Sequence, residues 1–230
     1  MTVPSIARQL WRTLAGDSAA LQPGTVTVVR GSRGIARPGW TGVIRLGDAF
    51  VIEAGEADAA ALDVLRALDD PSDPAQVDRA LHPARTLGPG ELFYLPEDGE
   101  VAVLEVGGEI EEVSVNSIRD WLDRLSVEDL EESSVHEMED ALVLRRDGQV
   151  LGAAGHRDWP SDIGHLGVVV SPEARGSGVG SALGAAATRR VLDRGRHPQW
   201  RAAAWNDASR IVADRIGYQK VGRQFSFRLT

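Results

Sequence analysis

The sequence predicts an α/β fold, a mixed β-sheet with helices packed on it, preceded by an N-terminal region that also mixes helices and strands. Two observations predict this. In the second half of the chain, strand patterns alternate with two helical patterns, so the helices are expected to cross between strands. The apolar run at 168–170 also leads into a glycine-rich loop and then an alanine-rich helix. With 230 residues, the chain can form one large domain or two small ones.

The first 112 residues, 1–112, are expected to form an α+β region of unassigned function. Apolar residues four positions apart, from Ile6 to Leu14, predict a first helix that ends at Gly16. The Gly47-Asp48 pair between two apolar runs predicts a β-hairpin of 41–46 with 49–54. The other elements expected in this region are strands at 25–29, 91–95 and 101–106 and helices at 57–68 and 74–82, the last capped by Ser72 or Asp73.

Residues 113–230 are expected to form a second domain, and Gly107-Gly108 with the acidic residues that follow marks the boundary region. Ser126 and Asp129 resemble a capping box at the start of a helix. Asp147-Gly148 between two apolar runs predicts a second hairpin, 141–156. The other expected elements are helices at 117–125, 180–194 and 207–216 and strands at 163–170, 201–205 and 224–229.

Composition excludes several classes of function. The absence of cysteine excludes a disulfide scaffold, an iron–sulfur cluster and a thiol nucleophile, and it favours a cytoplasmic location. The five histidines are scattered along the chain, so no metal site is expected. A net charge of −9 and a pI near 5.1 argue against nucleic acid as a partner. No apolar run approaches the roughly 20 residues of a membrane span, so no membrane partner is expected.

The loop after the strand at 163–170 predicts an anion site. Glycine stands at alternate positions, Gly176, Gly178 and Gly180, and this density costs folding entropy unless a ligand approaches the backbone or φ is positive. Free N–H groups at a helix N-terminus favour a phosphate there. A P-loop is excluded because the chain has no Gly-Lys-Ser/Thr sequence. The dinucleotide pattern GxGxxG fails as well, because its last position is Ser181 or Leu183.

A third kind of phosphate site fits the loop. The apolar strand, the turn at Pro172 and the run Arg175-Gly176-Ser177-Gly178-Val179-Gly180 resemble the acetyl-CoA site of the GNAT superfamily of N-acetyltransferases. The resemblance continues downstream with Asn206, Ser209 and Gly217-Tyr218 at the spacing of that family. It covers about residues 113–230 and implies a GNAT-like acetyltransferase fold there. Residues 1–112 carry no such signature, and they are interpreted as a structural extension, with a degenerate second copy or a substrate domain as alternatives.

The resemblance implies how acetyl-CoA (CoA) would bind. The loop amides would hold the pyrophosphate, the edge of the preceding strand would bond the pantetheine arm, and one strand amide would polarise the thioester carbonyl. Arg175 would either pair with a phosphate or pin the loop. The cofactor-binding residues implied are Val168, Val169, Val170, Arg175, Gly176, Ser177, Gly178, Val179, Gly180, Ser181, Asn206 and Ser209.

Direct attack by an amine needs a group that takes its proton and an acid for the leaving thiolate. Asp162 and His165 stand on the strand that leads to the loop and are the candidate bases, although Asp162 also suits a solvated turn and His165 a hydrogen-bonded core position. Many relatives carry a tyrosine as the acid where this chain has Ala213. Ser209, water or another segment must then protonate the thiolate.

The function expected from the resemblance is that of an enzyme, an acetyl-CoA-dependent N-acetyltransferase that moves an acetyl group to a primary amine of a small molecule or protein. The acidic segment 126–140 would suit a cationic acceptor, although such a helix face is often only solvated. The alternative, favoured by Ala213, is a non-catalytic or weakly catalytic CoA-binding regulatory module. A homodimer is the assembly expected if the first 112 residues supply a dimer surface.

Overall fold

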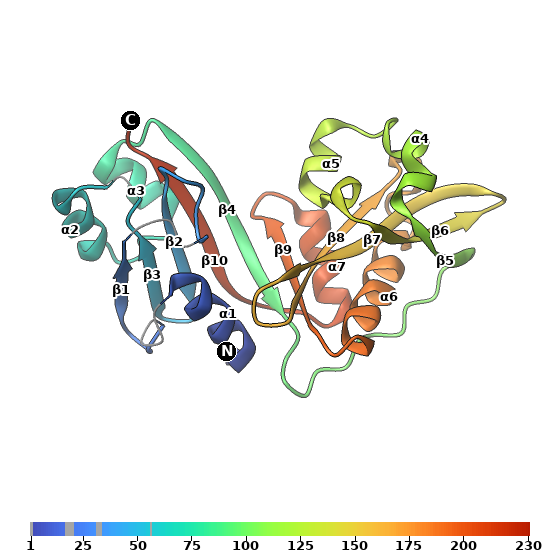
Figure 1. The fold of residues 1–230 in the computed structure, drawn as a ribbon, viewed down its shortest axis with the longest axis horizontal. Coiled ribbons are helices and arrows are strands. Elements are labelled where there is room, and N and C mark those ends of the chain that lie inside the picture. Colours follow the sequence, from blue (N-terminus) through green and yellow to red (C-terminus); the bar gives the residue numbers. More distant parts are fainter. Residues whose placement is uncertain (1, 17–20, 31–33, 56) are drawn as a thin grey trace. The chain divides into compact units, whose positions relative to one another are not determined.

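The computed structural model describes residues 2–16, 21–30, 34–55 and 57–230 (Figure 1). The chain divides into two compact units, each built from separate stretches of sequence. The first unit contains Met1–Phe93, Ala203–Asn206 and Lys220–Thr230, and the second contains Tyr94–Ala202 and Asp207–Gln219. The C-terminal strand is therefore counted with the N-terminal half. The domain limits 1–112 and 113–230 stay a prediction.

The first unit is built around a sheet whose strands lie in the order β1-β3-β2-β10-β4. β1 runs parallel to β3, whereas β2 runs antiparallel to both β3 and β10. The predicted hairpin is confirmed as β2 and β3. The bounds are β1 (Val26–Val29), β2 (Thr41–Leu46), β3 (Ala49–Glu53), β4 (Arg85–Tyr94) and β10 (Gln219–Arg228).

The helix ends of this unit follow local signals in the sequence. The first helix ends at Gly16, whose φ of 64° lies in the left-handed region. The third helix begins after Asp73, whose side chain accepts a hydrogen bond from the Ala75 N–H, so Asp73 is the cap that is used. Apolar residues of the second and third helices pack against one face of the sheet. The helix bounds are α1 (Ser5–Ala15), α2 (Ala59–Ala67) and α3 (Pro74–Leu81).

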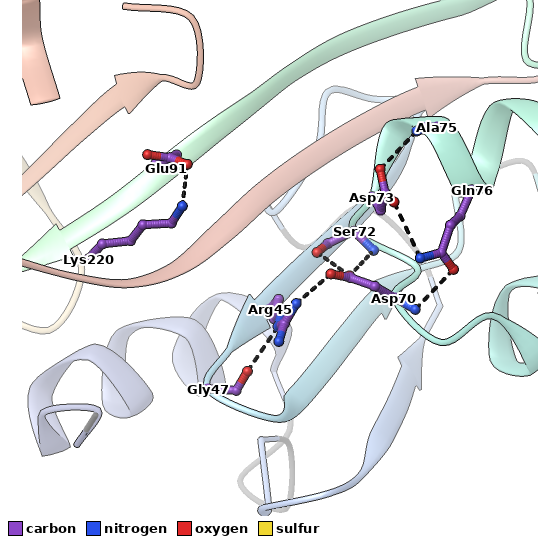
Figure 2. A network of polar contacts seen from close by, with 9 residues as sticks. All are labelled: Arg45, Gly47, Asp70, Ser72, Asp73, Ala75, Gln76, Glu91 and Lys220. Atoms are coloured by element: carbon purple, nitrogen blue, oxygen red, sulfur yellow. Dashed lines mark hydrogen bonds and ion pairs between the residues drawn. The ribbon is translucent and has the colours of Figure 1, made fainter. Parts of the chain in front are cut away.

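Asp70 fastens the loop before α3 to the sheet of the first unit (Figure 2). One carboxylate oxygen accepts hydrogen bonds from the Ser72 N–H at 2.9 Å and from the Ser72 hydroxyl at 2.5 Å. The other oxygen forms an ion pair with Arg45 of β2. In the same unit Glu91 is only 4 % exposed and pairs with Lys220. These polar side chains are engaged in contacts that stabilise the unit.

The second unit is built around a sheet in the order β9-β8-β7-β6-β5. β8 runs parallel to β9, and every other neighbouring pair is antiparallel. The predicted hairpin around Asp147-Gly148 is confirmed as β6 and β7. The bounds are β5 (Glu109–Ser114), β6 (Asp140–Arg146), β7 (Gln149–Trp159), β8 (Ile163–Val170), β9 (His197–Ala203), α4 (Arg119–Leu122), α5 (Val127–Ser133), α6 (Val179–Asp193) and α7 (Asp207–Ile216).

Opposite faces of this sheet pack on different helices (Figure 1). At Gly164, an added Cβ would lie 2.7 Å from a methyl group of Val191, so α6 covers that face closely. At Gly167, three residues along β8, a Cβ would lie only 1.9 Å from the Ser133 carbonyl oxygen, so the end of α5 covers the other face. Glycine is required at Gly167 because two backbones approach each other there.

The strand predicted at 101–106 is wrong. Val103 is 81 % exposed, so the apolar alternation there does not face a core. The segment is held instead through Ala102, whose N–H donates to the Ile216 carbonyl at 3.0 Å and whose carbonyl accepts from Arg189 at 2.6 Å. The strand forms further along, as β5, within the acidic stretch interpreted as a boundary. β5 is the last strand in the order of this sheet, and charged residues are common on edge strands.

Two other elements are displaced from their predicted places. The strand predicted at 201–205 is β9, which begins earlier because His197 already pairs with Ile163 of β8. The helix predicted at 117–125 is interrupted at Ile118, whose φ of −114° and ψ of 15° separate a short 3₁₀ turn from α4. Neither displacement moves the glycine loop, which lies between β8 and α6 as predicted.

Candidate active site

The loop between β8 and α6 has a backbone that glycine adopts at little cost. Gly176 and Gly178 have φ values of 77° and 88°, in the left-handed region. A Cβ built at either position would meet no atom within 4 Å. The loop backbone is therefore uncovered by side chains there, and an anion can approach its amides closely.

The start of α6 supplies unpaired donors beside these glycines. The first hydrogen bond of the helix joins the Ala182 N–H to the Gly178 carbonyl at 3.0 Å. The N–H groups of Val179, Gly180 and Ser181 therefore have no partner within the helix. Together with the helix dipole they favour negative charge. The residues present thus fit a phosphate group, and the contribution of each one stays a prediction.

The other small residues of the loop serve its own structure. The Ser177 hydroxyl donates to the Ala174 carbonyl at 2.6 Å and so closes the turn before the helix. A Cβ at Gly180 would lie 3.3 Å from a methyl group of Val170, so this glycine lets α6 approach β8. Ser181 is 4 % exposed in the first turn of α6. Of the three glycines, two therefore serve the backbone conformation and one serves close packing.

Arg175 is held by protein groups on both sides. Its Nε donates to the Val170 carbonyl at 3.4 Å, and one terminal nitrogen lies 2.7 Å from a carboxylate oxygen of Asp129 on α5. Its side chain remains 52 % exposed. These contacts favour the alternative in which Arg175 pins the loop.

Strands β8 and β9 part five residues before the end of β8. Their parallel register joins Ile163 to His197 and ends with His165 and Gln199, although β8 continues to Val170. On its other side β8 stays fully paired with β7 as far as Val170. Val168, Val169 and Val170 therefore have one strand edge that β9 leaves unpaired. This is the edge along which an extended ligand arm can add its own hydrogen bonds.

His165 lies at the point where these strands part. It is 8 % exposed, its Nδ1 lies 2.9 Å from Oε1 of Gln199, and the Trp159 ring stacks on it with centroids 4.7 Å apart. Burial lowers the pKa of His165 to about 3, and the positive charges of Arg201 and Arg157 add to this effect. The ring is therefore neutral near pH 7, which argues against its retaining a proton as a general base.

Asp162 lies in the turn between β7 and β8. Its φ is 56°, its side chain is exposed, and its carbonyl accepts a hydrogen bond from the His197 N–H at 2.8 Å. The backbone of Asp162 thus begins the pairing of β8 with β9. Its carboxylate has the surroundings of a solvated turn, and its role as a base stays a prediction.

Ser209 lies in the first turns of α7, and its Oγ accepts a hydrogen bond from Nε1 of Trp200 at 3.0 Å. This bond orients the hydroxyl and uses an acceptor position of the oxygen, not its proton. Asn206 is counted with the first unit, where its N–H donates to the Ala203 carbonyl at 2.9 Å. The predicted contacts of both residues with a cofactor stay predictions.

Ala213 and Tyr218 both lie in the core of the second unit. Ala213 is 0 % exposed, and its carbonyl accepts hydrogen bonds from the N–H groups of Gly217 and Tyr218 at the end of α7. The Tyr218 hydroxyl lies 3.0 Å from that of Thr188, and burial raises the pKa of Tyr218. The tyrosine that is present therefore has a structural position, and Ala213 contributes only a buried methyl group.

Sequence reasoning missed three polar residues around His165: Gln199, Tyr94 and Arg201. Gln199 is 0 % exposed and its Nε2 donates to the hydroxyl of Tyr94, which is 1 % exposed, at 2.5 Å. Arg201 lies over the Trp159 ring, with its Cζ 5.8 Å from the ring centroid. The available signal was a glutamine next to Trp200 and a tyrosine next to Phe93, because polar side chains that are buried among aromatic neighbours need partners.

A cavity of about 250 Å³ lies beside the loop, on the side of the β6–β7 turn. Ala174 and Ser177 of the loop form one wall, and residues of the turn form the other. The full lining is Arg146, Gln149, Val150, Leu151, Ser171, Glu173, Ala174 and Ser177. The cavity therefore adjoins the loop and does not include His165.

Two general features of the described residues bear on the type of site. No helix among them is both long and apolar enough to cross a lipid bilayer. Over the same part of the chain, histidine and carboxylate side chains form no group of three or more that could hold a metal ion.

Comparison with protein families bears directly on this region. Residues 110–218 match the model of the acetyltransferase (GNAT) family. The match includes the loop, α6 and α7 and ends at Tyr218. No curated protein sequence matches the chain significantly.

Solved structures extend the comparison to the fold. A GCN5-related N-acetyltransferase-like protein from Streptococcus suis superposes with a TM-score of 0.52 at 17% identity, covering 96% of this chain and 98% of that one. An acetyltransferase from the GNAT family of Colwellia psychrerythraea gives 0.53 at 13% identity, covering 77% and 75%. A Novosphingobium aromaticivorans protein described as a GNAT-family acetyltransferase gives 0.50 at 18% identity, covering 63% of this chain but only 65% of its own length. At such identities the likeness shows the fold alone, and it confirms the predicted α/β, GNAT-like architecture.

Proposed function

Since residues 110–218 form an acetyltransferase domain of the GNAT family, we propose that the protein transfers an acetyl group from acetyl-CoA to a primary amine. The observation that carries the proposal is the loop at 175–180. It combines open, left-handed glycines with unpaired helix donors, and it follows a strand edge that β9 leaves free. These are the features needed to hold a pyrophosphate and an extended arm in line.

The chain's own residues would do the binding. The amides from Gly176 to Ser181 would hold the pyrophosphate, and the edge of Val168–Val170 would bond the pantetheine arm. An amide of Val169 or Val170 would polarise the thioester carbonyl as charge develops on its oxygen. When bound, acetyl-CoA supplies the thioester carbon that the amine attacks.

Proton transfer in this proposal relies on water as much as on side chains. His165 has a pKa of about 3, so it can accept a hydrogen bond from the amine but does not keep the proton near pH 7. Asp162 is exposed to solvent and can pass a proton to the surrounding water. Ser209, whose oxygen is oriented by Trp200, is the candidate donor to the leaving thiolate.

A CoA-binding regulatory module is the second candidate function. It is favoured by Ala213, because a buried methyl group cannot donate a proton where many relatives carry a tyrosine. In that case the loop would bind CoA and turnover would be slow or absent.

The test is thiol release from acetyl-CoA by the full chain against a panel of amines. Because the chain contains no cysteine, a thiol reagent reports only the CoA thiol released. Release that depends on one class of amine supports the enzyme. Tight CoA binding without release from any amine supports the regulatory module, and absence of CoA binding overturns both.

The remaining expectations are part of the same proposal. The cysteine-free composition supports a cytoplasmic location. A small-molecule or protein amine as acceptor, and a homodimer as assembly, stay predictions.

A further inference from the structure

The cavity beside the glycine loop has two walls, and hydrogen bonds hold both in place. One wall is the β6–β7 turn, in which Arg146 and Gln149 are paired across the two strands, so their side chains lie on the same face. The other wall is the start of the loop. There the Ser171 N–H donates to the Leu151 carbonyl at 2.9 Å, and the Ser171 hydroxyl accepts from the Trp121 indole at 3.0 Å. The loop wall is therefore tied to β7 and to α4.

Three polar side chains of the lining keep hydrogen-bonding capacity for a ligand. Arg146 donates to the Gly107 carbonyl through Nε at 3.2 Å and through one terminal nitrogen at 2.7 Å, so the guanidinium is oriented while its other terminal nitrogen is not engaged there. Among the described residues, Arg146 and Glu173 have no partner of opposite charge, and the side-chain amide of Gln149 makes no hydrogen bond. All three side chains are exposed, so a ligand can reach them from solvent.

Neighbouring arginines on both walls have carboxylate partners. Arg145, the residue before Arg146 on β6, pairs with Glu111 of β5 at 2.5 Å. On the loop, Arg175 pairs with Asp129 of α5 at 2.7 Å. The unmatched charges of this region are therefore those that line the cavity.

The lining combines two opposite charges with apolar surface. Arg146 brings a positive charge from the turn, and Glu173 brings a negative charge from the loop. Val150, Leu151 and Ala174 add apolar atoms to the lining. The volume of about 250 Å³ corresponds to about eight water molecules, so the cavity suits a ligand of on the order of ten non-hydrogen atoms. A free amino acid with a short aliphatic side chain has this size, both charges and an apolar part.

We propose that the cavity between the β6–β7 turn and the glycine loop binds a free aliphatic amino acid that regulates CoA binding. Arg146 and Gln149 hold its α-carboxylate, and Glu173 holds its α-ammonium group. The bound amino acid also contacts Ala174 and Ser177 of the loop, so it restricts the backbone that would bind the pyrophosphate, and less freedom is then lost when CoA binds. This site goes beyond the proposed function, and amino-acid binding to it needs no acetyl transfer.

The first test titrates L-leucine into the full chain and follows the backbone amides by ¹H–¹⁵N NMR. Saturable shifts are expected for residues 149–151 and 173–177. 4-Methylpentanoate lacks the ammonium group and leucinamide lacks the carboxylate, so each is expected to bind at least about tenfold more weakly through the loss of a charge-assisted hydrogen bond. Shifts that are absent, that do not saturate or that are centred elsewhere overturn the proposal, and so does equal affinity for the three probes.

Two variants assign the charges of the ligand to the two walls. Arg146→Gln is expected to weaken L-leucine binding at least about tenfold but to leave leucinamide within about twofold, because leucinamide has no carboxylate. Glu173→Gln is expected to weaken L-leucine equally and to leave 4-methylpentanoate within about twofold. Arg124→Gln and Glu109→Gln make the same charge changes at exposed residues outside the lining and should not affect L-leucine. An equal loss in the controls, or for the probe that lacks the matching charge, contradicts the assignment.

Calorimetric titration of CoA with and without saturating L-leucine tests the regulation. CoA affinity is expected to rise at least about threefold, and by linkage L-leucine should bind the CoA-saturated chain more tightly by the same factor. An unchanged CoA affinity overturns the regulatory role. Loss of L-leucine binding in the CoA-saturated chain would mean that CoA itself fills the cavity, which overturns a separate site. If CoA does not bind to the chain at all, the proposed acetyltransferase function fails, while the L-leucine titration still decides whether the cavity binds an amino acid.

Discussion

The glycine loop at 175–180 and the His165 cluster, formed by His165, Gln199 and Tyr94, lie at opposite ends of the same free strand edge, and they are built in different ways. The loop is exposed and acts through its backbone: two left-handed glycines and the first amides of α6. The cluster is buried and acts through side chains from three strands, each oriented by the next. A substitution that changes the backbone conformation of one residue should therefore damage the loop. The loss of one hydrogen-bond partner should damage the cluster.

The largest expected effect is on the loop. Gly178→Glu places a side chain on a left-handed residue and a negative charge among the anion-binding amides, and we expect CoA affinity to fall by at least about a hundredfold, roughly 2.7 kcal/mol. Isothermal titration calorimetry with CoA measures it. Gly195→Glu is the matched control, because Gly195 has a φ of 70° and equally open surroundings at the far end of α6. An equal loss of CoA affinity in both variants would contradict the assignment of the loop.

The second largest effect is expected at the His165 cluster, on the way the free energy of unfolding depends on pH. Between the unfolded pKa of 6.5 and the folded value of about 3, the unfolded chain binds a proton at His165 that the folded chain does not. Stability contributed by the neutral ring is therefore lost as pH falls through this range, by about 1.4 kcal/mol per unit. His165→Gln is expected to remove this slope, about 2 to 3 kcal/mol between pH 6.5 and pH 4.5.

Urea unfolding at several pH values measures the slope. Arginine side chains as a class do not titrate between pH 4.5 and pH 6.5, so the slope is assigned to the imidazole. The pKa of His156 is also lowered by burial, so His156→Gln serves as the comparison and should leave most of the slope in place. An unchanged slope in His165→Gln would mean that His165 titrates normally and that the cluster is open to water.

A smaller effect concerns the contact that holds the loop to α5. Asp129→Asn removes the ion pair with Arg175, which is half exposed, and we expect the free energy of unfolding to fall by no more than about 1 kcal/mol. CoA affinity should stay within about threefold if Arg175 only pins the loop. Glu128→Gln makes the same charge change one residue earlier and controls for net charge. An increase in CoA affinity of more than about threefold in Asp129→Asn, but not in Glu128→Gln, would show that Arg175 binds phosphate once it is released from Asp129.

The smallest effect is expected at the third glycine of the loop. Gly180 has an ordinary helical backbone, and a Cβ there would be 3.3 Å from Val170, so Gly180→Ala should change stability by less than about 1 kcal/mol and CoA affinity by less than about threefold. Gly176→Ala, at a φ of 77°, should cost about 1 to 2 kcal/mol. Thermal unfolding compares the two. Equal losses of stability in the two variants would mean that the backbone at Gly176 requires glycine no more than the backbone at Gly180 does.

The difference between these regions also explains what could be predicted from the sequence. The loop, both hairpins and the caps at Asp73 and Ser126 depend on local chemistry, and the structure has them where they were predicted. The Gln199 and Tyr94 contacts join residues 105 positions apart, so no local pattern indicates them. The strand predicted at 101–106 is wrong for a related reason: the apolar alternation is present, but no strand among the described residues pairs with this segment.

The division of the chain into units has a consequence for how the protein is made. β10 is the last strand in the sequence, yet it lies between β2 and β4 in the first unit (Figure 1). During synthesis the strands before it emerge first, and β2 is left without a neighbour on one side until residues 219–228 leave the ribosome. An exposed strand edge of this kind is prone to pairing with other chains. Truncation before Gln219 should therefore yield a protein that aggregates, even though every residue of the glycine loop would still be present.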